Sequence, residues 1–281
     1  MPETISTSVD LSGEDVHWSP EGGLSYGAYL KLDHILKAQS PLTAEHDEMM
    51  FIIIHQASEL WLKLCLHELD AAIDCINRGE FGPASKMLSR IARIQEQLTQ
   101  SWAILATMTP ADYLKFRDRL GQSSGFQSYQ YRMLEYRLGN KNAAMARVHG
   151  KSEHADAVRK YLNLPSIYDE ALKQLAKAGF DIPADRLERD WSEPYKPSAE
   201  VEAAWKEVYS NIEDHWQLYE MAEKLVDVEH KFQLWRFNHM KTVERIIGYR
   251  RGTGGTGGVS YLVKALDLRF FPELWTVRTS L

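Results

Sequence analysis

Residues 46–69 read HDEMMFIIIHQASELWLKLCLHEL, and this stretch decides the fold. Apolar residues recur in it at intervals of three and four, which is the spacing of one face of an α-helix. The acidic Asp47 and Glu48 come just before this face, where carboxylates suit the positive end of a helix. We therefore predict a long helix that buries the following stripe: Met50, Ile53, Ile54, Ala57, Leu60, Trp61 and Leu64.

The same helical spacing extends outward along the chain. A second long helix is predicted through residues 88–105, and a third, either straight or kinked, through residues 201–247. Residues 140–197 contain four prolines and shorter helical patterns. No stretch alternates apolar and polar residues in the way that a half-buried strand would. These patterns predict an all-α fold, a single-domain bundle of long antiparallel helices over residues 21–281, with a flexible polar segment over residues 1–20.

Local signals divide the middle of the chain further. Thr109 can cap a short helix, Pro110 suits its first position, and Asp112 stands where a capping-box acid belongs. This helix should end at Gly121. A further helix should start at Ser123 or Ser124 and end at Gly139-Asn140, because glycine and asparagine favour helix C-termini.

Composition excludes several classes of protein. The 281 residues are 44% hydrophobic and 26% charged, which excludes a disordered chain or a fibre. The net charge of -6 argues against a nucleic-acid partner. The two cysteines, Cys65 and Cys75, form no Cys-x-x-Cys motif and are expected to be buried reduced thiols. The N-terminus lacks the features of a signal peptide and no apolar run approaches a membrane span, so we expect a cytoplasmic protein.

Two of the ten histidines end apolar runs. His55 follows Phe51-Ile52-Ile53-Ile54, and His239 follows Leu234-Trp235-Arg236-Phe237-Asn238. An imidazole in an apolar wall is a common setting for a metal ligand or for a residue that hydrogen-bonds a buried ligand, although a core histidine with an ordinary partner is an alternative. His55 lies about 100° around the helix from the main stripe, on a mixed face with Phe51, Ser58 and Leu62. By contrast, His149 and His154 stand in polar surroundings and are expected on the surface.

An arginine and a glycine-rich run are further candidates for ligand binding. Tyr113, Arg117 and Leu120 share one face of the short helix, and a guanidinium fork there suits a carboxylate beside an apolar group. Residues 252–258 (GTGGTGG) match GxGxxG, but no βαβ unit surrounds them, so a dinucleotide site is not indicated. They could form a loop that closes over a polar ligand, or a simple flexible connector.

Metal motifs are tested by their spacing. HExxH and the paired ExxH of di-iron bundles are both absent. One apolar histidine among many aromatic residues in a helical protein instead suits a non-covalent haem.

Together these segments resemble the tryptophan 2,3-dioxygenase family, in its bacterial form. The resemblance rests on YGAYLKLDHILKAQ (residues 26–39), residues 46–69 as quoted, FRDRLGQSSGFQSYQYR (116–132), LVDVEHKFQLWRFNHM (225–240), RGTGGTGGVSYL (251–262) and FFPELWTVRTS (270–280). These stretches span nearly the whole chain. The resemblance implies a homotetrameric haem enzyme that inserts O2 across the indole C2–C3 bond of L-tryptophan to give N-formylkynurenine, the first step of the kynurenine pathway.

The resemblance also implies a role for particular residues. His239 would bind the iron of haem b, one haem per subunit, and His55 would be the catalytic distal residue that accepts a hydrogen bond from the indole N–H. Arg117 and Tyr113 would hold the substrate carboxylate, and Thr253 would meet the ammonium. The remaining substrate-binding residues would be Phe51, Ile52, Ile53, Ile54, Leu120 and Ser124, together with Tyr26, Tyr29 and Leu30 from the N-terminal segment of a neighbouring subunit. Ile54 replaces a more polar residue of the family.

Two other kinds of protein would share some of these features. A non-enzymatic haem or indole binder would need the same His239 and aromatic pocket but would form no product. A purely structural helical protein would bind neither haem nor tryptophan.

Overall fold

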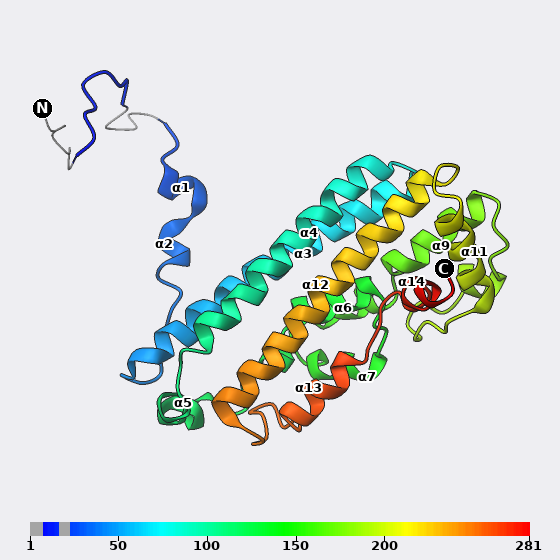
Figure 1. Cartoon of the computed structure of the whole chain (residues 1–281). Helices are drawn as coiled ribbons and strands as arrows, with labels where there is room; N and C mark the ends of the chain where they lie inside the picture. The colour runs from blue at the N-terminus through cyan, green and yellow to red at the C-terminus, as the bar shows by residue number, and fades with distance from the viewer. Residues whose placement is uncertain (1–7, 17–22) are drawn as a thin grey trace, which may run out of the picture. The chain divides into compact units, whose positions relative to one another are not determined.

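The computed structural model describes residues 8–16 and 23–281, and the chain divides into two units, Met1–Pro41 and Leu42–Leu281. Three long helices form the centre of the second unit (Figure 1): α3 (His46–Asn77), α4 (Phe81–Leu105) and α12 (Trp216–Ile247). No strand occurs in the described ranges, so the all-α prediction is confirmed.

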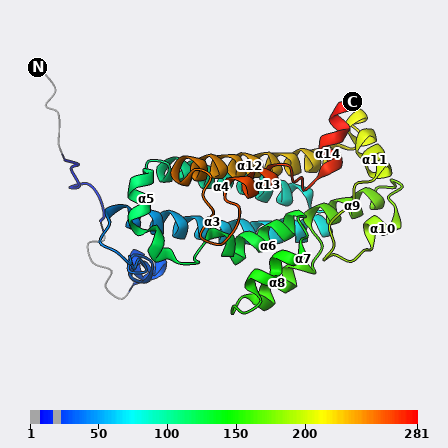
Figure 2. The ribbon, with the colours of Figure 1, turned by 90° about the horizontal axis from the view of Figure 1, so that it is seen from below.

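The directions of these helices follow from their connections. A tight turn that contains Gly79, at a φ of 77°, reverses the chain between α3 and α4. Helix α12 packs along α4 and runs in the same direction as α4, as both views show (Figures 1 and 2). Lys231 lies 2.7 Å from Glu96, and further along both helices the Nε of Arg245 donates to the carbonyl of Ala106 at 2.9 Å. The bundle therefore has α3 antiparallel to both α4 and α12.

The buried face of α3 differs from the predicted stripe. Ile53 and Leu60 are 47% and 54% exposed, so the expectation that they face the core is wrong. Leu62, which was placed on the mixed face, is 5% exposed and lies in the core. The reason is that α3 is covered on different sides along its length, by α4, α6 (Tyr129–Leu138) and α9 (Ile167–Lys177), so no single stripe describes it.

Capping residues set the helix ends near the middle of the chain. Thr109 and Asp112 form the expected capping box at the start of α5 (Pro110–Arg117), which continues as the 3-10 turn η1 (Asp118–Leu120). Ser124 caps the short turn η2 (Gly125–Gln127) rather than the next long helix. That helix, α6, is capped by Ser128 and ends at Gly139. The predicted start of α5 and the predicted end at Gly139 are therefore confirmed, whereas the predicted helix start at Ser123 or Ser124 is wrong, because a separate 3-10 turn comes first.

Short elements connect α6 to the last long helix. They are α7 (Ala143–Ala146), η3 (Arg147–His149), α8 (Ala155–Leu162), α9, α10 (Ala184–Leu187) and α11 (Ala199–Ser210). The pattern predicted as one helix over residues 201–247 is in fact two, because the chain leaves the helical conformation at Asn211 (φ -128°, ψ 59°) and α12 begins at Trp216.

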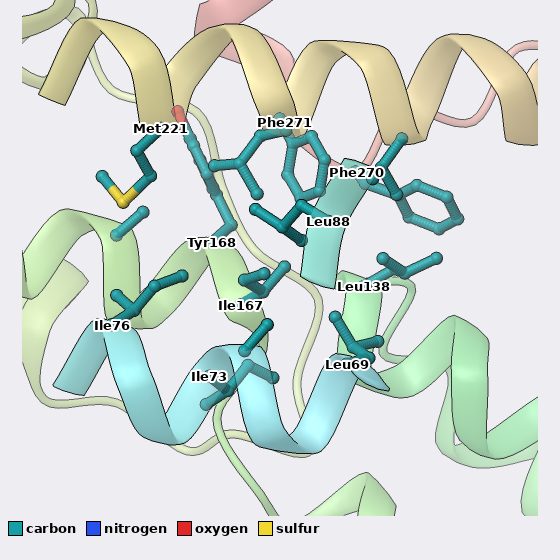
Figure 3. Close-up of a cluster of buried hydrophobic side chains, with 14 of the residues drawn as sticks. Leu69, Ile73, Ile76, Leu88, Leu138, Ile167, Tyr168, Met221, Phe270 and Phe271 are labelled. Atoms are coloured by element: carbon teal, nitrogen blue, oxygen red, sulfur yellow. The ribbon is translucent and has the colours of Figure 1, made fainter. Parts of the chain in front are cut away.

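The main core lies where α3, α4, α9 and α12 meet (Figure 3). Leu69 and Ile73 from α3 pack with Ile167 and Tyr168 from α9, and each of these four is at most 2% exposed. Removing one such side chain, as in Leu69→Ala, should cost about 2–5 kcal/mol of folding free energy. Cys65 and Cys75 are free and buried, as expected.

The C-terminal elements are tied to α12 by a buried carboxylate. They are α13 (Val259–Leu266), α14 (Pro272–Thr276) and η4 (Val277–Thr279). Glu229 accepts hydrogen bonds from the backbone N–H groups of Phe270 and Phe271 and from the indole N–H of Trp275, at 2.8–3.1 Å. These contacts fix the segment that follows α13 against the middle of α12.

The first unit contains α1 (Tyr26–Leu30) and α2 (Leu32–Ile35), with Ser25 capping α1. The predicted flexible segment, residues 1–20, lies partly outside the described residues; its described part, residues 8–16, contains no helix, and its flexibility stays a prediction.

By length and composition alone, α3 could cross a membrane, a test that core helices of soluble proteins also pass. It contains the buried acids Glu48 and Glu68, and Glu68 pairs with Arg90 of α4. These polar contacts favour the interpretation of α3 as a helix of the bundle over its interpretation as a membrane span.

Candidate functional site

A smaller buried cluster lies at the end of the bundle opposite the main core. It is formed by Ile54, Trp102, Leu105, Met108, Tyr113, Phe116 and Ile246. Phe51, Leu120 and Trp235 pack against it. Helices α3, α4, α5 and α12 therefore converge here, and they bring both singled-out histidines to one region.

On the α12 side, His239 stands between aromatic rings. Its imidazole stacks on the indole of Trp102 from α4, with centroids 4.5 Å apart and 12° between planes, and it lies 5.6 Å from Trp235. Burial, with a smaller contribution from His55, lowers the pKa of His239 to about 4. The described residues provide no hydrogen bond to its ring. It is a neutral imidazole with a lone pair available to a ligand.

On the α3 side, the imidazole of His55 has a defined tautomer. Its Nδ1 is 2.7 Å from the carbonyl oxygen of Phe51, one turn earlier. A carbonyl oxygen only accepts, so Nδ1 carries the proton and Nε2 has the free lone pair. Burial lowers the pKa of His55, which favours this neutral form. The Phe51 ring lies 4.2 Å from that of His55.

Helix α5 adds a phenol and a guanidinium. Tyr113 is 9% exposed, its ring is 5.9 Å from that of Phe51, and burial raises the pKa of its hydroxyl. Arg117 donates from Nη2 to the carbonyl of Arg251 at 2.9 Å, while its Nε is buried with no partner in the described structure. A buried N–H without an acceptor is costly, so this guanidinium is prepared to receive an anion.

The glycine-rich run is folded against the turn after α5. The Thr253 hydroxyl donates to the carbonyl of Ser123 at 2.5 Å. A Cβ on Gly254 would stand 2.8 Å from the side chain of Ser124, so only glycine allows this approach. Together with the bond from Arg117 to Arg251, these contacts place Thr253, Ser124 and Arg117 in one region.

The residues that the resemblance assigns to substrate binding differ in how far they are buried and in where they lie. Ile54 lies in the buried cluster, Ile52 is half-buried and Ile53 is largely exposed. Tyr26 and Tyr29 on α1 are 75% and 70% exposed, and Leu30 is half-buried. These last three belong to the first unit.

Some residues near the site were not singled out from the sequence. Trp102 lies within the second predicted long helix, and its contact with His239 depends on the packing of α4 on α12, which no local pattern reveals. His149 was expected on the surface, but it is 3% exposed, because the η3 turn is folded inward toward α6 and Arg132. His154 is half-buried and its ring stacks on that of Tyr129.

The donor set around His239 fits a haem. The described residues contain no cluster of three or more His, Cys, Asp or Glu side chains that could hold a bare metal ion. A porphyrin supplies the equatorial nitrogens itself, so one neutral imidazole in aromatic surroundings is sufficient. The buried indole N–H of Trp102 also lacks an acceptor, as expected where a polar group is prepared for a ligand.

The fold and site define a class: all-helical proteins in which a neutral, aromatic-flanked imidazole lies in one region with a second neutral imidazole and with a guanidinium whose Nε has no partner. The model of the family "Tryptophan 2,3-dioxygenase" matches residues 11–165 and 206–281. The chain belongs to this family.

Relatives with the same family name align over nearly the full length. The tryptophan 2,3-dioxygenase of Bacillus thuringiensis subsp. konkukian (strain 97-27) is 55% identical, covering 95% of this chain and 96% of the relative. That of Ralstonia pickettii (strain 12J) is 57% identical, covering 92% and 93%. That of Paraburkholderia phytofirmans is 57% identical, covering 100% and 93%.

Proposed function

We propose that this protein is a haem-dependent dioxygenase that inserts O2 across the indole C2–C3 bond of L-tryptophan and forms N-formylkynurenine, the first step of tryptophan catabolism by the kynurenine pathway. The observation that carries this proposal is the convergence of His239, His55 and Arg117 on one aromatic region of the bundle. Membership of the family supports it.

In this proposal, His239 would bind the iron of haem b. The stack with Trp102 orients its imidazole, and the neutral state leaves a nitrogen lone pair for the metal. When bound, the haem supplies the binding and activation of O2.

The indole would be held by α3. The ring packs on Phe51, and its N–H donates to the Nε2 of His55, which is the acceptor because Nδ1 is bonded to the Phe51 carbonyl. An electron-rich indole needs no strong base to react, so His55 acts as a catalytic residue by orienting the ring. Ile52, Ile53 and Ile54 belong to the same helical segment, and we propose that this segment lines the pocket with Leu120 and Ser124.

The amino-acid part of the substrate would be recognised by opposite charges. Arg117 and Tyr113 bind the carboxylate, with the Nε of Arg117 gaining the acceptor that it lacks. Thr253 accepts from the ammonium. Arg117 is bonded to Arg251 at the start of the glycine-rich loop, and Thr253 of the loop is bonded to Ser123, so substrate binding and loop closure are coupled.

We also propose a cytoplasmic homotetramer. Tyr26, Tyr29 and Leu30 would complete the active site of a neighbouring subunit, which accounts for two large aromatic side chains on α1 being exposed within their own chain.

The proposal is tested by haem reconstitution followed by turnover. Purified protein with added haem should show a Soret band, and its ferrous form should convert L-tryptophan to N-formylkynurenine under O2. His239→Ala should abolish the Soret band of a specific complex, while His230→Ala, on an exposed position of the same helix, should leave it unchanged. A Soret band that His239→Ala leaves intact, or haem binding without any product, would contradict the proposal.

A further inference from the structure

A carboxylate without a role in the proposed mechanism lies one helical turn after His55. Glu59 is the i+4 neighbour of His55 on α3, so the two side chains share a face of the helix, with their Cβ atoms about 5–6 Å apart. Glu59 is half-buried, and no Lys or Arg of the described residues forms an ion pair with it. Its negative charge is therefore available to act on the imidazole beside it.

Gln130 of α6 fixes the position of this carboxylate. It is the second residue of α6 and is 9% exposed. Its Nε2 donates to the side-chain Oε2 of Glu59 and to the backbone carbonyl of Glu59, both at 2.8 Å. The first turn of a helix also carries partial positive charge, which favours a carboxylate at this place. The side chain of Glu59 is thus held on the α6 side of α3 by a neighbouring helix.

The charge of Glu59 acts on His55 against the effect of burial. Burial lowers the pKa of His55, whereas the hydrogen bond with the Phe51 carbonyl and the negative charge of Glu59 raise it. The other titratable or charged groups that α5 and α12 bring to this region are Tyr113, Arg117 and His239. Among the charged side chains, Glu59 is the one that acts on the pKa of His55.

We propose that Glu59, fixed by Gln130, is a positioning residue that acts through His55 and strengthens the hydrogen bond that Nε2 of His55 accepts from the indole N–H. This inference rests on the proposed function and extends it to the electrostatic environment of the distal imidazole. A nearby negative charge stabilises positive charge on an imidazole, and such charge grows as the indole N–H donates more strongly. Glu59 therefore offsets part of the basicity that His55 loses through burial.

The test removes the charge and keeps the packing. Glu59→Gln retains an oxygen that can accept from Gln130. In the haem-loaded enzyme, this variant should lower the plateau of kcat/KM for tryptophan by about 3- to 10-fold and move its acidic decline to a pH lower by about 0.5–1. Asp74→Asn, on an exposed position of α3 about five turns from His55, is the matched control and should change neither.

A second measurement needs neither haem nor turnover. The full-length chain is labelled with ¹⁵N-histidine and purified without haem, and the titration of His55 is followed by NMR, with His55→Ala identifying its signals. The midpoint of this titration should also move to lower pH in Glu59→Gln, by about 0.5–1, and should stay unchanged in Asp74→Asn.

Three results would overturn the inference. The first is a Glu59→Gln enzyme whose acidic decline and His55 titration both match those of the wild type. The second is lower activity with an unmoved decline, which would mean a purely structural role. The third is an equal movement in Asp74→Asn, which would mean a general effect of net charge.

A replacement variant keeps the test decisive if Glu59→Gln loses helical circular dichroism. Gln130→Met leaves the carboxylate but removes the donor that fixes it, so it should move the acidic decline in the same direction, and an unmoved decline would again overturn the inference. Wild-type protein that forms no product would refute the proposed function as well. An active wild type with an unmoved Glu59→Gln profile refutes only the role of Glu59.

Discussion

His55 shows how a backbone contact determines side-chain chemistry. The Phe51 carbonyl fixes the proton on Nδ1, and burial keeps the ring neutral, so Nε2 can accept but not donate. A protonated His55 would offer two N–H donors and would repel the indole N–H. The role proposed for His55 therefore depends on the environment that α3 gives it.

The pH dependence of the reaction should reflect this environment. The pKa of His55 lies below its usual 6.5, so the neutral form is fully populated at neutral pH and is lost only as the pH falls through the lowered value. We expect kcat/KM for tryptophan to stay level down to pH 6.5 and to decline below it. His55→Ala should reduce the activity without abolishing it and should remove this decline. A decline centred above pH 6.5, absent from the variant, would contradict the assignment.

Arg117 gives a second prediction at this scale. Arg117→Ala should raise KM for tryptophan by roughly 10- to 100-fold, because a charge-assisted pair contributes about 1.5–3 kcal/mol. Arg119→Ala, in the exposed turn η1 beside it, is the matched control and should change KM little. Steady-state measurements of KM for tryptophan in both variants test this prediction. An unchanged KM in Arg117→Ala would show that the carboxylate is bound elsewhere.

Among the elements, the helices could be predicted from local sequence, but their contacts could not. Thr109, Pro110 and Asp112 specify the start of α5 through short-range chemistry, and the prediction is confirmed. The exposure of Ile53 and Leu60 depends on which helices cover α3, and that is a property of the tertiary structure. In the same way, His55 and Arg117 could be singled out from their own helices, whereas the stacking of Trp102 on His239 and the inward turn of His149 could not.

The glycine-rich loop provides a prediction about an element. Gly254→Ala places a Cβ against Ser124, which should displace the loop and raise KM for tryptophan by roughly tenfold to a hundredfold through misplaced substrate contacts. Gly125→Ala is the control, since its Cβ would meet no atom within 4 Å. Steady-state kinetics of both variants make the comparison. Equal KM values for the two variants would show that the loop position does not matter for binding.

At the scale of the whole molecule, several apolar side chains are exposed on the single chain. Ile53 and Leu60 lie two turns apart on one face of α3, and a tetramer would cover such a face. We expect sedimentation at four times the 32.3 kDa chain mass. Leu60→Glu should shift the sedimentation of the protein toward smaller species. Lys63→Glu, at another exposed position of α3, serves as the control for added charge. A monomeric wild-type protein with full activity would refute the proposal that Tyr26, Tyr29 and Leu30 complete a neighbour's site.

The most direct test of the account follows the oxygen atoms. Ferrous, haem-loaded protein is given L-tryptophan under ¹⁸O₂, and the product is analysed by mass spectrometry. The account predicts N-formylkynurenine in which both inserted oxygen atoms carry the label, since one molecule of O2 supplies both. A product labelled at one position only, with the other oxygen derived from water, or no product from protein that shows a Soret band, would contradict it.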